Sequence, residues 1–324
     1  MKIGIVGAGI SGLGAGRILQ RAGHQVVVFE KSAGLGGRLA TRRVGEFVFD
    51  TGATSLAPGT SELARMMTQE LPTDDLVEIP LPIWAIEMGR AQPGGLNKGK
   101  GPRYSYRSGI TKLAKLFAEG LDVRLNCLVE SVQSNGQYQI NDEGFDAIIL
   151  TPPMPQTELL LASMGEKRSF GGVRFRSCLS VLLGFDQPDP KVGYSAVIDP
   201  EQRSPLFWLS MESLKSPGRA PSGYSAMVAQ LGQQYSEGHY DSPDAHIIEE
   251  TLVLVKRLIG PEFGEPTVAQ VKRWRYSQPE LTVSFDAANP VGSRAIVCGD
   301  WVVGGRVEYA YEAGVLAAQR ILAL

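Results

Sequence analysis

The sequence predicts an α/β protein, α+β overall, in which a parallel-sheet domain carries an inserted domain with a mixed sheet. Two observations predict this. A strand–helix–strand unit occupies the first 30 residues, and short apolar segments typical of buried parallel strands recur much later, at 146–150 and 295–298. The intervening chain, from about 166 to 280, has longer strand-like segments that do not alternate regularly with helices. With 324 residues the chain is long enough for two such units.

The N-terminal unit has a clear local pattern. Residues 2–6 are almost wholly apolar and read as a strand, and Gly-Ala-Gly-Ile-Ser-Gly follows at 7–12. Apolar residues then recur at helical spacing from Ile10 until Gly23, where a helix would end. Residues 25–29 form a second apolar strand that ends in Glu30. The order and the lengths are those of a βαβ unit.

The remaining elements follow from the same periodicities, taken in chain order. We expect a hairpin within 32–53, a helix at 60–70, a small sheet within 72–106, a helix at 109–119, and strands at 122–125, 128–133, 137–141 and 146–150. In the second region we expect strands at 178–185, 206–210, 224–230 and 267–274, a helix at 244–259, a strand at 295–298 and a last helix at 307–322. That last helix is expected to carry Val307, Ala310, Gly314, Val315, Ala318 and Leu322 on one face.

Composition excludes several classes of function. The formal charge is −2 and the isoelectric point is near 6.0, so neither a nucleic-acid groove nor a polybasic membrane patch is expected. The apolar segments are too short to span a membrane, and strand-like sequence begins at Lys2, so a cytoplasmic location is expected. Three cysteines and three histidines show no metal-ligand spacing, and no metal site is expected.

The first motif is Gly7-x-Gly9-x-x-Gly12, placed between a strand and a helix, with Glu30 at the end of the next strand. Gly7 allows a tight turn, Gly9 lets the backbone approach a pyrophosphate, and Gly12 lets the helix pack closely on the strand. The helix N-terminus favours negative charge, and the carboxylate of Glu30 can accept hydrogen bonds from a ribose. A Rossmann-like dinucleotide site is therefore expected; the alternative is a tight turn that binds nothing.

The second motif is Gly34-Leu-Gly-Gly-Arg38, which an NAD-binding unit does not need. The segments GAGISGLGAG, FEKSAGLGGRLATRR and DTGA together resemble the N-terminus of FAD-dependent amine oxidases and their relatives. That resemblance implies that Gly36, Gly37 and Arg38 lie along the FAD pyrophosphate, with Arg38 supplying a charge-assisted contact.

The third motif lies near the C-terminus, in Cys298-Gly-Asp-Trp and in Gly304-Gly-Arg-Val-Glu, and it resembles the C-terminal FAD motif of the same superfamily. This implies that Asp300 contacts the ribityl hydroxyls and that the last helix faces the N1–O2 edge of the flavin. Val129 resembles the position whose backbone meets adenine. Together the motifs imply the following FAD contacts: Gly7, Gly9, Ile10, Ser11, Gly12, Glu30, Lys31, Gly36, Gly37, Arg38, Thr51, Gly52, Ala53, Thr54, Val129, Thr151, Pro152, Trp274, Gly299, Asp300, Gly305, Arg306 and Val307.

Within the superfamily, the resemblance extends to renalases and renalase-like bacterial oxidoreductases. It is carried by Lys-Arg-Trp-Arg-Tyr at 272–276 with Pro279, and by the segments 297–301 and 305–308. The resemblance implies hydride transfer from a reduced nicotinamide, a dihydropyridine isomer of NAD(P)H, to flavin N5, with reoxidation by oxygen. Trp274, Arg275 and Tyr276 are then the candidate residues of the substrate pocket.

Two other functions remain open. The first is a flavin amine oxidase, or a desaturase of apolar substrates. Monoamine oxidases attach their flavin to a cysteine and carry a lysine on a central strand. No cysteine lies between Cys178 and Cys298, and the comparable strand at 177–185 has no lysine, so non-covalent FAD is expected and amine oxidation is disfavoured. The second is a non-catalytic flavin-binding protein with a regulatory role.

These motifs define a discontinuous domain division. Residues 1–73, 107–165 and 283–324 are expected to form the FAD-binding domain, and residues 74–106 and 166–282 the substrate domain. Glycine makes up 38 of the 324 residues, about 12% against an average near 7%. Much of this surplus lies within the three motifs, where backbone would lie against a cofactor or a neighbouring element.

Overall fold

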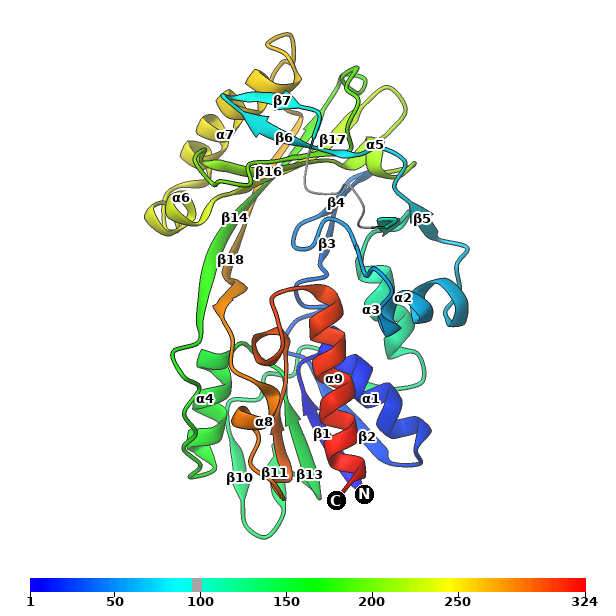
Figure 1. Cartoon of the computed structure of the whole chain (residues 1–324), viewed down its shortest axis with the longest axis vertical. Coiled ribbons are helices and arrows are strands. Elements are labelled where there is room, and N and C mark those ends of the chain that lie inside the picture. The colour runs from blue at the N-terminus through cyan, green and yellow to red at the C-terminus, as the bar shows by residue number, and fades with distance from the viewer. Residues whose placement is uncertain (95–100) are drawn as a thin grey trace.

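A five-stranded parallel sheet forms the lower part of the molecule in the computed structural model, which describes residues 1–94 and 101–324 (Figure 1). Its strands stand in the order β19 (Ala295–Val297), β13 (Ala147–Leu150), β1 (Lys2–Val6), β2 (Gln25–Phe29) and β9 (Asp122–Arg124). Every neighbouring pair is parallel. Strands distant in sequence thus meet in one sheet, as the recurring apolar segments predicted. Residues 95–100, within the predicted 74–106 segment, lie outside the described residues.

Helices α1 (Ile10–Arg21) and α9 (Val307–Leu322) pack against each other beside this sheet (Figure 1). Their contact is close because of Gly314, where a Cβ atom would lie 2.3 Å from the carbonyl oxygen of Ser11. The predicted bounds of the last helix are confirmed. On its predicted face, Gly314 and Ala318 are buried, Val307, Ala310 and Val315 are partly buried against the core, and Leu322 is exposed. The buried residues are Tyr311, Ala313, Gly314, Ala317, Ala318 and Ile321.

A seven-stranded mixed sheet forms the upper part of the molecule (Figure 1). Its order is β18 (Val268–Leu281), β14 (Arg174–Phe185), β17 (Ser225–Leu231), β16 (Leu206–Met211), β15 (Ala196–Ile198), β6 (Ile83–Glu87) and β7 (Arg90–Gln92). Helix α7 (Asp244–Ile259) buries its apolar stripe against this sheet, at the predicted bounds. Each sheet has its own large hydrophobic core. The exact boundaries of the two domains stay a prediction.

Strands β14 and β18 are much longer than expected and run from the upper sheet down towards the parallel sheet (Figure 1). The predicted strand 267–274 ended at Trp274. The structure continues it to Leu281, which pairs with Arg174, and the ladder has irregularities near Arg174 and Arg176. The segment that holds the candidate pocket residues is therefore a strand that links the two parts of the molecule.

The smaller elements complete the fold. They are β3 (Thr41–Val44), β4 (Phe47–Asp50), α2 (Glu62–Arg65), η1 (Met66–Glu70), β5 (Leu76–Glu78), β8 (Tyr104–Tyr106), α3 (Thr111–Ala118), β10 (Val132–Ser134), β11 (Tyr138–Ile140), β12 (Glu143–Phe145), α4 (Met154–Ser163), α5 (Glu212–Lys215), α6 (Gln233–Gly238), α8 (Phe285–Ala288) and η2 (Asp300–Val302). Helix α4 was not among the expected elements. Pro152, Pro153 and Pro155 surround its start, and proline is favourable in the first helical turn. The strand predicted at 128–133 is wrong up to Ser131, since β10 begins at Val132. Among the described residues no helix combines the length and the apolar character needed to cross a membrane.

Candidate functional site

A cavity of about 2240 Å³ is lined by residues from the N-terminal motifs, the C-terminal motif and strands β14 and β18. Of the residues predicted to contact the cofactor, all but Gly12, Thr51 and Gly299 line it. Those that do are Gly7, Gly9, Ile10, Ser11, Glu30, Lys31, Gly36, Gly37, Arg38, Gly52, Ala53, Thr54, Val129, Thr151, Pro152, Trp274, Asp300, Gly305, Arg306 and Val307. The candidate pocket residues Arg275 and Tyr276 also line this cavity.

The two glycine motifs meet at the wall of the cavity. Gly9 and Gly36 form a parallel bridge, and the Gly36 amide donates to the Ala8 carbonyl at 2.8 Å. Gly7 has a φ of 103°, a conformation that favours glycine, and a Cβ atom on Gly12 would lie 2.2 Å from the Gly7 oxygen. A Cβ atom on Gly9, in contrast, would meet no protein atom within 4 Å. The turn therefore needs Gly7 and Gly12 for its own packing, and at Gly9 it leaves backbone open to a ligand.

Glu30 braces this turn. Its side chain is only 7% exposed, and its carboxylate accepts from the Ala8 amide at 2.9 Å and from the Ser32 amide at 2.8 Å. Each carboxylate oxygen has further acceptor capacity. Glu30 therefore ties the two loops together, and its contact with a ribose stays a prediction.

Arg38 and Asp300 bind each other across 262 positions of sequence. The guanidinium donates to both carboxylate oxygens, at 2.6 and 2.7 Å, and also to the Ser277 carbonyl at 3.1 Å. The sequence assigned these two residues to separate parts of a cofactor, and the pairing itself was missed. An anionic ligand at Arg38 would have to compete with Asp300 for the guanidinium, or share it.

Hydrogen bonds from the upper sheet hold the loop 51–54 in place. The Thr51 carbonyl accepts from the Trp274 indole and from the Ser180 hydroxyl, both at 2.8 Å, and the Gly52 carbonyl accepts from the Gln230 amide at 2.6 Å. Thr51 itself lies behind the cavity wall, whereas Trp274 lines the cavity with its ring oriented by this bond.

Four fully buried charged residues lie directly behind this loop. Lys215 contacts Asp50 at 2.9 Å and Glu212 at 2.6 Å, and Arg219 contacts the same two carboxylates at 2.8 and 3.3 Å. Lys215 also donates to the Thr54 carbonyl at 2.8 Å. Burial by itself would raise the pKa of Asp50, but Lys215 and Arg219 outweigh it and hold that pKa below its usual range. The cluster was missed because its members are separated in sequence by up to 169 positions.

Three cationic side chains, Arg176, Lys272 and Arg275, also line the cavity. Within residues 1–94 and 101–324, none of the three forms an ion pair with a carboxylate. The Lys272 ammonium lies 4.8 Å from the centre of the Trp274 ring, and the Arg275 guanidinium lies 4.6 Å from the centre of the Tyr240 ring. Lys272 was not predicted as a pocket residue. The alternation of side chains along a strand, which puts positions 272 and 274 on one face, is the signal that could have found it.

The other predicted residues have local partners. Tyr276 packs edge-on against Phe175, with ring centres 5.8 Å apart. Arg306 contacts Glu308 at 2.8 Å and donates to the Ala57 carbonyl at 3.2 Å. Tyr276 therefore forms part of an aromatic wall, and the charge of Arg306 is partly neutralised by its neighbour.

The βαβ unit and the parallel sheet define a Rossmann-like α/β fold, with a large cavity at its glycine turns. Residues 5–71 match the family described as NAD(P)-binding Rossmann-like domain, and residues 82–322 match the family described as flavin containing amine oxidoreductase. The chain belongs to the flavin containing amine oxidoreductase family, which makes it a member of a family of flavin-dependent oxidoreductase enzymes. The superfamily and the Rossmann-like α/β fold expected from the motifs are confirmed.

Individual relatives are similar over part of the chain or in fold alone. A 4,4'-diapophytoene desaturase from Staphylococcus aureus (strain bovine RF122 / ET3-1) is 43% identical over 54 residues, 17% of this chain and 11% of that protein. The match thus spans about a tenth of that curated relative. A putative protoporphyrinogen oxidase from Exiguobacterium sp. 255-15 has a TM-score of 0.81 at 15% identity and covers 100% of this chain and 99% of that one. A putrescine oxidase bound to putrescine has a TM-score of 0.73 at 14% identity, covering 100% of both chains.

Proposed function

We propose that the chain is an FAD-dependent oxidoreductase whose electron donor is a reduced nicotinamide dinucleotide, a dihydropyridine isomer of NAD(P)H, with oxygen as electron acceptor. The observation that supports this proposal is the composition of the cavity. The cavity lined by the residues predicted to hold FAD is also lined by Arg176, Lys272 and Arg275, and none of these three cations has a carboxylate partner in the described chain. A donor that carries phosphate groups matches this lining.

The residues present fit FAD. Gly9 leaves backbone open to a pyrophosphate, Glu30 and Asp300 offer carboxylates to hydroxyl groups, and Arg38 offers a guanidinium. A cavity of about 2240 Å³ exceeds the roughly 300–1,000 Å³ typical of sites for one drug-sized ligand, so it has room for a dinucleotide and a second molecule. When bound, FAD supplies the two-electron chemistry, accepting a hydride from the donor and passing electrons to oxygen.

We expect the FAD to be non-covalent. Cys178 lines the cavity, but its side chain is buried and burial raises the pKa of its thiol to about 11. A thiol that stays protonated at neutral pH is a poor nucleophile for attachment to a flavin.

The chain's own part in this reaction is binding and orientation. Lys272 lies on β18 beside the Trp274 ring, so a phosphate held by Lys272 would bring its nicotinamide ring close to that indole, while Arg275 lines the same cavity over Tyr240. The bond from Trp274 to the Thr51 carbonyl fixes the ring, and the Tyr276 ring adds a second aromatic surface. A protonated amine would meet the same cations unfavourably.

The first test is anaerobic mixing of the yellow holoenzyme with dihydropyridine isomers of NAD(P)H. We expect the flavin absorption to bleach within seconds and to return when oxygen is admitted with formation of peroxide. Under argon, a panel of amines and a panel of apolar polyenes are expected to leave the flavin oxidised. Bleaching by amines or polyenes in place of the nicotinamides would replace this proposal with the amine oxidase or desaturase alternative. If every donor fails while FAD binds tightly, the flavin-binding regulatory role is supported.

A pair of substitutions tests the role of the cations. Lys272→Met and Arg275→Met are each expected to raise the half-saturation concentration for the dinucleotide by about tenfold or more, because each removes a charge-assisted contact. Reduction by a dihydronicotinamide without phosphates should change little, and Lys272→Arg should retain most of the affinity. An equal loss for both donors would mean that these residues act on the flavin or the fold and not on the phosphates.

The second candidate, amine oxidation, has one observation in its favour. The strand expected to carry a lysine has none, but Lys272 is paired with Ser180 across β14 and β18 and lines the cavity beside Trp274. A lysine therefore does reach the cavity from the neighbouring strand. The amine panel above decides between the two donors.

A further inference from the structure

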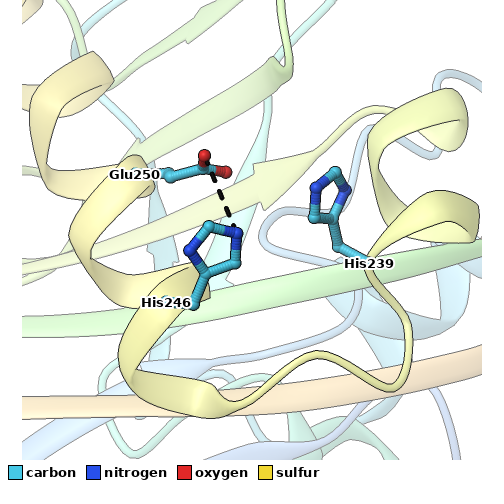
Figure 2. Close-up of side chains that lie close together, drawn as sticks. All are labelled: His239, His246 and Glu250. Atoms are coloured by element: carbon cyan, nitrogen blue, oxygen red, sulfur yellow. Dashed lines mark ion pairs between the residues drawn. The ribbon is translucent and has the colours of Figure 1, made fainter.

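The segment that joins helices α6 and α7 brings three metal-ligating side chains together, although the sequence showed no metal spacing. His239 follows the end of α6, and His246 and Glu250 lie one turn apart on α7 (Figure 2). One ligand atom of each residue lies within 4.8 Å of the other two. Among the described residues this is the one cluster of its kind.

The spacing of these atoms is close to that of a metal site. His246 Nε2 and Glu250 Oε1 are 3.7 Å apart, and ligand atoms in a tetrahedral zinc site lie about 3.4 Å apart. The two histidine rings have their centres 5.8 Å apart. Because His246 and Glu250 are half-exposed, small side-chain rotations can close the remaining distance without disturbing the core.

Tyr235, on α6, orients two of the three ligands. Nδ1 of His239 lies 3.0 Å from the Tyr235 carbonyl oxygen. A carbonyl only accepts, so this bond puts the proton on Nδ1 and leaves the lone pair on Nε2. The Tyr235 ring stacks on the His239 ring at 4.1 Å between centres, and its hydroxyl donates to Glu250. Supporting contacts of this kind are typical of metal ligands.

We propose that His239, His246 and Glu250 bind a divalent transition-metal ion, zinc in the first instance, with water completing the coordination. Two imidazoles and one carboxylate are a usual ligand set for zinc, and the partial exposure of the cluster gives an ion access. This proposal does not depend on the proposed function, because the cluster lies outside the cavity lining.

The effect of the ion would be to brace a wall of the cavity. Tyr240 follows His239 directly, lines the cavity and lies under Arg275. On the other side, Arg273 donates to the carbonyls of Tyr240 and Ser242, at 2.7 and 2.6 Å. An ion that joins His239 to α7 would hold this same loop, residues 239–243, through a second set of contacts.

Isothermal titration of Zn²⁺ into chelator-treated, desalted holoenzyme tests the proposal. We expect one equivalent to bind, and at least about tenfold weaker binding after His246→Ala or Glu250→Gln. Tyr235→Phe should weaken binding by about tenfold as well, because it removes the contact that orients Glu250. The matched control is His24→Ala, since His24 is the one histidine of the chain outside the cluster and lies between α1 and β2. This variant should bind zinc like the wild type.

Thermal melting gives a second readout that does not depend on catalysis. Zn²⁺ should raise the melting temperature of the wild type and of His24→Ala, and leave that of His246→Ala unchanged. His246 is exposed, so the variants should fold normally without zinc. Absence of zinc binding in the wild type, or equal binding in wild type and His246→Ala, would overturn the proposal.

Discussion

Replacing Gly9 with valine is expected to weaken FAD binding by at least about a hundredfold without unfolding the protein. A Cβ atom at this position meets no protein atom within 4 Å, and the backbone there is extended, with φ −76° and ψ 173°. The new side chain would therefore project into the cavity, where the proposed pyrophosphate needs close approach to the backbone. The measurement is the flavin content of the purified variant, followed by titration of its apoprotein with FAD.

Gly12→Val provides the contrast. Its Cβ atom would lie 2.2 Å from the Gly7 oxygen, so this change should disturb the turn itself and lower the melting temperature of the apoprotein. Gly9→Val should leave that temperature nearly unchanged, because the cost of a poor N-cap residue is only about 1 kcal/mol. Normal flavin content in Gly9→Val, or unfolding of its apoprotein, would contradict the assignment of this turn to the cofactor.

Local periodicity made the βαβ unit and the two longest helices among the described residues predictable. The βαβ unit, α7 and α9 all follow from apolar spacing read over single segments, and the bounds of both helices are confirmed. The buried face of α9 was not predictable in the same way. Which residues of a helix are fully buried depends on its neighbour, and α9 packs Gly314 against Ser11 of α1, from the other end of the chain.

Contacts between distant segments explain what the sequence could not predict about the site. The Arg38–Asp300 pair joins residues more than 160 positions apart, and so do the contacts of Asp50 with Lys215 and Arg219. A pattern within one segment cannot predict such pairings. The glycine motifs could be interpreted as tight turns from the sequence, because each turn is formed by a few consecutive residues. The pocket residues of β18 could only be proposed, because their neighbours Tyr240 and Phe175 are contributed by other elements.

Arg219→Met is expected to lower the free energy of unfolding by about 3–5 kcal/mol. Arg219 is completely buried and donates to Asp50, to the Ser105 hydroxyl and to the Tyr106 carbonyl, at 2.7 to 2.9 Å. Its removal leaves two buried carboxylates with Lys215 as their one remaining partner in the cluster, and an uncompensated buried charge is costly. Denaturant unfolding measures the change.

Two comparisons separate this effect from a general loss of charge. Arg203→Met removes an arginine whose pair with Glu201 is exposed, and should change stability by less than about 1 kcal/mol. Adding Glu212→Gln to Arg219→Met restores the charge balance of the cluster and should recover part of the loss. Equal effects of Arg203→Met and Arg219→Met would refute a structural role for the buried cluster.

The pH dependence of stability gives the same cluster an independent signature. Because the pKa of Asp50 lies below its unfolded value of about 3.9, its stabilising contribution is present above about pH 4 and is lost as the pH falls through the folded value. Without Arg219 one of the two cations that lower this pKa is gone, so the folded value moves up. The loss of stability in acid that comes from Asp50 should therefore be smaller in the variant, and complete at a higher pH, than in the wild type, in unfolding curves recorded from pH 7 down to acid. Parallel curves would show that Asp50 does not depend on Arg219 for its charge.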